Sequence, residues 1–244
     1  MKSQDPPIEI LQPIFNLFTN GNFQQALANS RKMLEKFPNS VILCNISGAS
    51  NVGLMQFDDA IDNYKKALKI KPDYAEAYYN MGNALKGKDN FEAAVISYKN
   101  ALEIKSDYAE AYYNMGIALK KNGDLEAAID SYKNALKIKP NHTEAYINMG
   151  NIQKDKGDLE AAIDSYKKAI EIKSDYSEAK ESLVSLMTSY RTQKGNSNLI
   201  IKVNEEIRKI EIEGDLSRVI SDEQVVNLLS RAEDCISSFG LELE

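Results

Sequence analysis

The chain has 244 residues and a formal net charge of -6, with 30 Lys and Arg residues against 36 Asp and Glu residues. Binding to a phosphate backbone depends on a dense excess of basic residues, and no part of this sequence carries one, so nucleic acid is not expected as a partner. The length is sufficient to bury a substantial apolar interior, either in one large domain or in a linear array.

The N-terminus and the cysteines favour a cytoplasmic protein. The first residues, MKSQDPPIEILQP, include an early acid and three prolines where a signal peptide carries an apolar run. No later segment approaches ~18 consecutive apolar residues, so membrane insertion is not expected. Cys44 and Cys235 lie far apart, and we interpret them as buried thiols rather than as part of a disulfide framework.

Residues suited to catalysis or metal binding are scarce. His142 is the only histidine, so a two-histidine zinc site or a Ser-His or Cys-His nucleophile pair would have to use it. It lies in the sequence PNHTE, which is typical of a surface turn. The sequence contains no phosphate-binding glycine motif and no nucleophile elbow. We therefore predict a protein without catalytic residues, metal ligands or cofactors.

A strict repeat runs through most of the chain. The segments AEAYYNMG, AEAYYNMG and TEAYINMG begin at residues 75, 109 and 143, thirty-four residues apart. In rows of thirty-four residues that start at Pro7, the same residue types stand in the same columns. Column eight holds Gly48, Gly82, Gly116 and Gly150, and column twenty holds Ala60, Ala94, Ala128 and Ala162. A period of this length indicates a solenoid of stacked repeats.

The expected elements follow from these rows. In chain order they are an N-terminal arm at 1–6, repeats at 7–40, 41–74, 75–108, 109–142 and 143–176, a capping helix at 177–193, and a helical tail of unknown role at 194–244. The first repeat is the least regular, and Pro13 is predicted to kink or delay its first helix.

Each repeat is predicted to form two short amphipathic helices. Gly123 and Gly157 are expected to end first helices in a left-handed conformation, and Pro38, Pro72 and Pro140 mark where second helices stop. Four residue pairs have the spacing of a capping box at the start of a first helix: Asp73 with Glu76, Asp107 with Glu110, Asn141 with Glu144, and Asp175 with Glu178. The small residues at columns eight and twenty are expected to let the two helices approach closely.

This column pattern resembles the tetratricopeptide repeat. The features shared with that family are Gly at column eight, Ala at twenty and twenty-seven, aromatic residues at four and twenty-four, and Pro at thirty-two, over residues 7–176. The resemblance implies an all-α fold, a right-handed α-solenoid of helix-turn-helix repeats with a C-terminal capping helix and extra helices. It also implies that columns two, five, six, nine, twelve and thirteen of each first helix line a concave face.

On that face, column six holds one amide per repeat, at Asn80, Asn114 and Asn148. An asparagine can donate and accept at once, so it can pair with the backbone of an extended peptide. The arrangement is similar to the asparagine ladder of the O-linked N-acetylglucosamine transferases. The other expected contacts of the groove are Asn83, Asn151, Tyr79, Tyr113, Lys86, Lys120, Lys121 and Lys154. A simpler interpretation involves no ligand. Asparagine is common at column six of generic repeats, and a lysine at the end of a first helix interacts favourably with the helix dipole.

We therefore expect a non-catalytic protein–protein interaction scaffold that binds a protein or peptide partner. The carboxylate clamp for chaperone C-termini is disfavoured, because its basic columns here hold Glu, Tyr or Ile, and Asn. Two alternatives remain open. In the first, the chain is the N-terminal substrate-recognition module of a larger bacterial multidomain enzyme of transferase type. In the second, it is a self-assembling scaffold whose near-identical middle repeats offer compatible surfaces.

Overall fold

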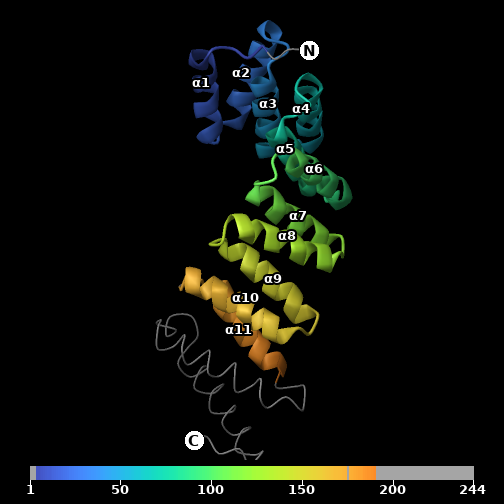
Figure 1. Ribbon diagram of the computed structural model, residues 1–244. Helices are drawn as coiled ribbons and strands as arrows, with labels where there is room; N and C mark the ends of the chain where they lie inside the picture. Colours follow the sequence, from blue (N-terminus) through green and yellow to red (C-terminus); the bar gives the residue numbers. More distant parts are fainter. Residues whose placement is uncertain (1–3, 175, 191–244) are drawn as a thin grey trace, which may run out of the picture. The chain divides into compact units, whose positions relative to one another are not determined.

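The computed structural model of the protein describes residues 4–174 and 176–190, and within them every regular element is an α-helix. The expected all-α fold is confirmed. The helices of the described residues are α1 (Ile8–Thr19), α2 (Phe23–Lys36), α3 (Val41–Gly53), α4 (Phe57–Ile70), α5 (Ala75–Gly87), α6 (Phe91–Ile104), α7 (Ala109–Lys121), α8 (Leu125–Ile138), α9 (Thr143–Asp155), α10 (Leu159–Ile172) and α11 (Ser177–Tyr190) (Figure 1). The predictions for Asp175, Cys235 and the tail at 194–244 lie outside the described residues.

The chain divides into two compact units, Met1–Pro140 (unit 1) and Asn141–Glu244 (unit 2). In unit 1 each helix from α1 to α7 packs against the next helix along the chain, and in unit 2 α9 packs on α10 and α10 on α11 (Figure 1). Within each unit this is the helix-turn-helix packing of an α-solenoid. None of the described helices combines the length and the apolar character that a membrane-spanning helix requires.

The column-eight glycines lie against tyrosine rings of the same repeat. A Cβ atom added to Gly82 would lie 2.6 Å from Cε1 of Tyr98. The same relationship holds for the other three pairs, Gly48 with Tyr64, Gly116 with Tyr132, and Gly150 with Tyr166. The column-twenty alanines are fully buried, as the close approach of the helices requires. What fills the space in front of each glycine, however, is the column-twenty-four ring.

The predicted helix ends are confirmed. Gly123 has φ 84° and Gly157 has φ 81°, so both adopt the left-handed conformation that closes a helix. The second helices α2, α4 and α8 end at residues 36, 70 and 138, each two residues before a proline. In the second and third repeats the left-handed position is occupied by Met55 and Asp89, with φ values of 60° and 57°.

The predicted capping boxes are wrong for α5, α7 and α9. These helices have Tyr74, Tyr108 and His142 at the N-cap, and none has a side-chain capping bond. Because each helix starts one residue later than predicted, the preceding acid or amide lies in the turn and does not reach the free N–H groups of the first turn. His142 lies in its turn as expected, with Nδ1 3.0 Å from Oε2 of Glu144.

Side-chain caps occur instead on three second helices. Asn90 Oδ1 accepts a hydrogen bond from the N–H of Ala93 at 3.3 Å. Asp124 and Asp158 cap α8 and α10 in the same way. These side chains directly follow the left-handed residue, so one short turn ends the first helix and starts the second.

The start of the chain is tied to the third helix. Asp5 Oδ1 accepts hydrogen bonds from Ser40 Oγ at 2.6 Å and from the N–H of Ile42 at 3.0 Å. A carboxylate at this position also interacts favourably with the N-terminal end of α3. α1 begins at Ile8 and continues through Pro13, so the first helix is not delayed, and a kink at Pro13 stays a prediction.

Candidate peptide-binding face

Three of the predicted site residues meet where α5 packs near α7. Asn114 Nδ2 donates a hydrogen bond to Tyr79 Oη at 3.0 Å, and Lys86 Nζ donates one to Asn114 Oδ1 at 2.7 Å. An ammonium group can only donate, so the amide oxygen of Asn114 must face Lys86 and its nitrogen must face Tyr79. The side chain of Asn114 is therefore held in one orientation.

The column-six amide of the preceding repeat is held in a related way. Asn80 Nδ2 donates a hydrogen bond to Asn45 Oδ1 at 3.0 Å. In both cases the column-six amide bonds to the column-five side chain of the repeat before it, Asn45 for Asn80 and Tyr79 for Asn114. All of these side chains are half-buried. The predicted ladder residues of unit 1 thus link adjacent repeats, and each keeps part of its hydrogen-bonding capacity.

The column-nine amides accept hydrogen bonds from buried phenols. Tyr98 Oη donates to Asn83 Oδ1 at 2.8 Å in unit 1, and in unit 2 Tyr166 Oη donates to Asn151 Oδ1 at 2.7 Å. Burial raises the pKa of Tyr98, which keeps this phenol protonated as a donor. Asn83 and Asn151 therefore fix the tyrosine that packs on the column-eight glycine of their own repeat.

The fourth repeat lacks this bond. Its column-nine residue is Ile117, and the buried hydroxyl of Tyr132 has no hydrogen-bond partner among the described residues. An unpaired buried hydroxyl is unfavourable because it loses its hydrogen bonds to water without replacement. The sequence contained the signal for this defect, since column nine reads Asn83, Ile117 and Asn151 along the three similar repeats.

The aromatic residues around Tyr79 form a cluster. Its ring centroid lies 4.8 Å from that of Tyr108 and 6.0 Å from that of Tyr98. Tyr113 has the equivalent position in the next repeat, with its centroid 5.9 Å from that of Tyr132. Tyr79 therefore packs on the rings of Tyr98 and Tyr108, and its hydroxyl group lies beside the column-six amide of Asn114.

The lysines predicted for the edge of the groove differ from one another. Lys86 is half-buried, and burial lowers the pKa of its ammonium group. Lys120 is half-buried and Lys121 is exposed at the end of α7, and within the described residues neither forms a hydrogen bond or an ion pair. Lys154 and Asn148 both lie on α9 in unit 2 and are half-buried.

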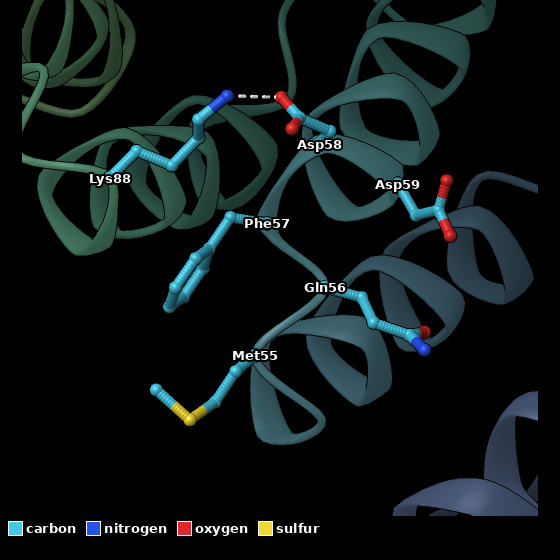
Figure 2. A pocket seen from close by; sticks show the side chains of 6 residues that line it. All are labelled: Met55, Gln56, Phe57, Asp58, Asp59 and Lys88. Atoms are coloured by element: carbon cyan, nitrogen blue, oxygen red, sulfur yellow. Dashed lines mark hydrogen bonds and ion pairs between the residues drawn. The ribbon is translucent and has the colours of Figure 1, made fainter.

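A surface pocket of about 300 Å³ is lined by none of these residues. The side chains that line it come from the turn between α3 and α4, from the start of α4 and from the C-cap of α5: Met55, Gln56, Phe57, Asp58, Asp59 and Lys88 (Figure 2). Figure 2 shows Lys88 extending toward Asp58, with which it forms an ion pair, while Met55 and Phe57 point to the same side. Within residues 4–174 and 176–190 no group of acidic, His or Cys side chains is arranged to hold a metal ion.

Comparison with known proteins identifies the repeats. Family models described as TPR repeat match residues 56–89 and 87–123, and those described as tetratricopeptide repeat match residues 109–142 and 143–176. No curated protein matches the chain. The tetratricopeptide repeat matches begin at residues 109 and 143, where predicted repeats begin, whereas the TPR repeat matches begin at residues 56 and 87, inside predicted repeats.

Several solved structures are similar to this chain. A crystal structure of MamA is 31% identical, covering 65% of this chain and 93% of that one with a TM-score of 0.62, and a second MamA structure is 29% identical, covering 68% and 91% with a TM-score of 0.62. YrrB, described as a TPR protein with an unusual peptide-binding site, is similar in fold at 24% identity, covering 72% and 91% with a TM-score of 0.61. These matches support a protein-interaction scaffold. The chain belongs to the tetratricopeptide repeat family.

Proposed function

We propose that this chain is a non-catalytic scaffold that binds an extended segment of a partner protein on the face formed by Tyr79, Asn80 and Asn114. The observation that carries the proposal is the amide of Asn114, which Tyr79 and Lys86 hold in a single orientation. An amide fixed in this way loses little conformational entropy when a ligand binds, so its remaining N–H contributes to affinity at small cost.

The chemistry of the face suits a peptide backbone. Asn80 keeps one N–H and its amide oxygen, because its only hydrogen bond within the described residues runs from Nδ2 to Asn45. A backbone presents N–H and C=O groups at every residue, so a fork of donor and acceptor can pair with it whatever its side chains are. The half-buried ring of Tyr79 adds flat apolar contact beside this fork.

The same hydrogen bonds also have a structural role, since each one links two repeats. A net contribution of about 1 kcal/mol per bond to the free energy of unfolding is expected for such links. A role in stability alone predicts that removing an amide lowers stability and leaves the affinity for ligands unchanged. The proposed function predicts that both fall.

The test uses peptides selected from a displayed random-sequence library on the full chain. Their affinities are measured by fluorescence anisotropy for the wild type and for the variants Asn80→Ala and Asn114→Ala. We expect each variant to weaken binding about tenfold, the change that corresponds to about 1.4 kcal/mol. Helicity, followed by circular dichroism, should stay at the wild-type level.

The matched control is Asn100→Ala, which removes a half-buried amide from α6, a helix that carries none of the proposed contacts. It should leave the affinity at the wild-type value. Equal affinities for the wild type, Asn80→Ala and Asn114→Ala would refute the proposal. In unit 2, Asn148, Asn151 and Lys154 stay predicted contacts, which Asn148→Ala tests separately on the same peptides.

A further inference from the structure

We infer that the part of the face around Asn114 is a subsite for a carboxylate group, so that the bound segment carries an aspartate or glutamate side chain at one position. The inference rests on the proposed function, because it names the chemistry of the peptide that the same face binds.

The first argument is the direction of the hydrogen bonds. Tyr79 Oη accepts from Asn114, so its own O–H proton stays available for another acceptor. Lys86 uses one of its N–H groups on Asn114 Oδ1, and the other N–H groups stay available. The second N–H of Asn114 is also unused within the described residues. The unused capacity of this trio has more donors than acceptors, because four N–H or O–H groups remain against one further lone pair on each of the two oxygens. An excess of donors suits an anionic oxygen pair.

The second argument is charge. No described carboxylate forms an ion pair with Lys86, and the only hydrogen bond of its ammonium group within these residues is to the neutral amide of Asn114. A nearby carboxylate would raise the pKa of this ammonium, whereas burial is the cause that lowers it. A partly desolvated cation without a counter-charge is unfavourable, and a carboxylate from a ligand supplies that charge.

The number of charges favours a carboxylate over a phosphate group. One ammonium, that of Lys86, takes part in this network, so it balances the single negative charge of a carboxylate rather than the nearly double charge of a phosphomonoester. Tyr79 and Asn114 then share the second oxygen through neutral donors. A side-chain carboxylate fits better than a chain terminus, because the proposed peptide continues past Asn114 to Asn80.

The neighbouring repeat provides an internal contrast. Asn80 bonds to Asn45, which is at column five of the second repeat. Column twelve of that repeat is Val52, so no cation has the position that Lys86 has beside Asn114. That position should accept neutral backbone groups. The preference for an acid is therefore expected at a single position of the peptide and not along its whole length.

The experiment uses the library peptides selected on the full wild-type chain. The expected sequences share Asp or Glu at one position. For one such peptide, replacing the acid with its amide counterpart should lower the affinity for the wild type about tenfold. The same replacement should have little effect on binding to Lys86→Met, and Lys99→Met, which removes an exposed ammonium from α6, should behave as the wild type does.

Three results with a selected acidic peptide would overturn the inference. The first is an amide-substituted peptide that binds the wild type as tightly as the acidic one does. The second is a tenfold loss of affinity on the same replacement when the peptide is measured with the variant Lys86→Met. The third is a loss of affinity on amidation of the peptide C-terminus with no effect of the side-chain replacement, which assigns the subsite to a chain terminus. Peptides that bind through Asn80 and Asn114 without any acid preference overturn this inference alone, whereas failure to select any peptide overturns the proposed function with it.

Discussion

A Cβ atom on Gly82 would lie 2.6 Å from Cε1 of Tyr98, closer than any packed pair of carbon atoms allows. We therefore predict that Gly82→Ala lowers the free energy of unfolding by about 1–3 kcal/mol, the range for overpacked cores. Alanine is a better helix former than glycine by about 1 kcal/mol, so helix propensity alone predicts that the substitution raises the free energy of unfolding. Urea denaturation followed by circular dichroism decides between them, and a variant as stable as the wild type contradicts the packing account.

Two chemically identical substitutions should differ in their effects on stability. Tyr98→Phe removes the hydrogen bond to Asn83 and should cost about 1 kcal/mol. Tyr132→Phe removes a hydroxyl that has no partner among the described residues, so its effect should be neutral or stabilising. Thermal unfolding of both variants provides the measurement, and equal losses of stability would show that the two hydroxyls have equivalent surroundings.

The left-handed residue of the second repeat is a site for stabilisation. Met55 has φ 60° and its side chain is 76% exposed, so it bears backbone strain without contributing to the core. Met55→Gly should raise the free energy of unfolding by about 1 kcal/mol, because glycine adopts this conformation without a Cβ penalty. The reverse change at the equivalent position, Gly123→Ala, should destabilise by a similar amount. The prediction fails if denaturation midpoints show that Met55→Gly is less stable than the wild type.

Stability should decrease in alkaline solution. Burial raises the pKa of Tyr74 and of Tyr166 to about 12 from the ordinary value of 10, and it also raises that of Tyr64. The unfolded chain releases these phenol protons near pH 10 while the folded chain keeps them, so the stabilisation is complete below pH 10 and is lost as the pH rises toward 12. Denaturant titrations on either side of pH 10 measure the effect. A constant free energy of unfolding across this window, or a full tyrosinate absorbance near pH 10, contradicts it.

The sequence predicted the parts of the fold that depend on local backbone constraints. Gly123 was assigned to a left-handed position because few other residues adopt it, and the end of α4 before Pro72 follows from the geometry that proline imposes on its neighbour. Such constraints act within a few residues of the chain, and the thirty-four-residue repeat shows them several times over. These helix ends could therefore be predicted from the sequence.

The capping boxes failed because a shift of one residue decides which side chain reaches the first turn. Asp73 and Glu76 have the correct spacing, but Tyr74 is the N-cap residue of α5 and Asp73 lies before it. Spacing alone does not distinguish these two arrangements. The tie between Asp5 and Ser40 was missed for a different reason, since it joins residues that no repeat column relates.

The candidate site was predictable as a set of columns and not as a network. The sequence places Tyr79, Lys86 and Asn114 on first helices, but the hydrogen bonds among them depend on rotamers and on how far Lys86 extends to the next repeat. Tyr79 and Lys86 of the preceding repeat use part of the hydrogen-bonding capacity of the Asn114 amide, so only the rest is available to a ligand. The column pattern does not reveal this. That remaining capacity determines which ligand chemistry the face can accept.

Binding of a library-selected peptide to the wild type and to Asn114→Ala is the most direct test of the central claim. The account predicts an affinity about tenfold weaker for the variant, with unchanged helicity and only a modest decrease in the free energy of unfolding. A variant that binds the peptide as tightly as the wild type does would contradict it, because the amide would then serve only to join α5 and α7.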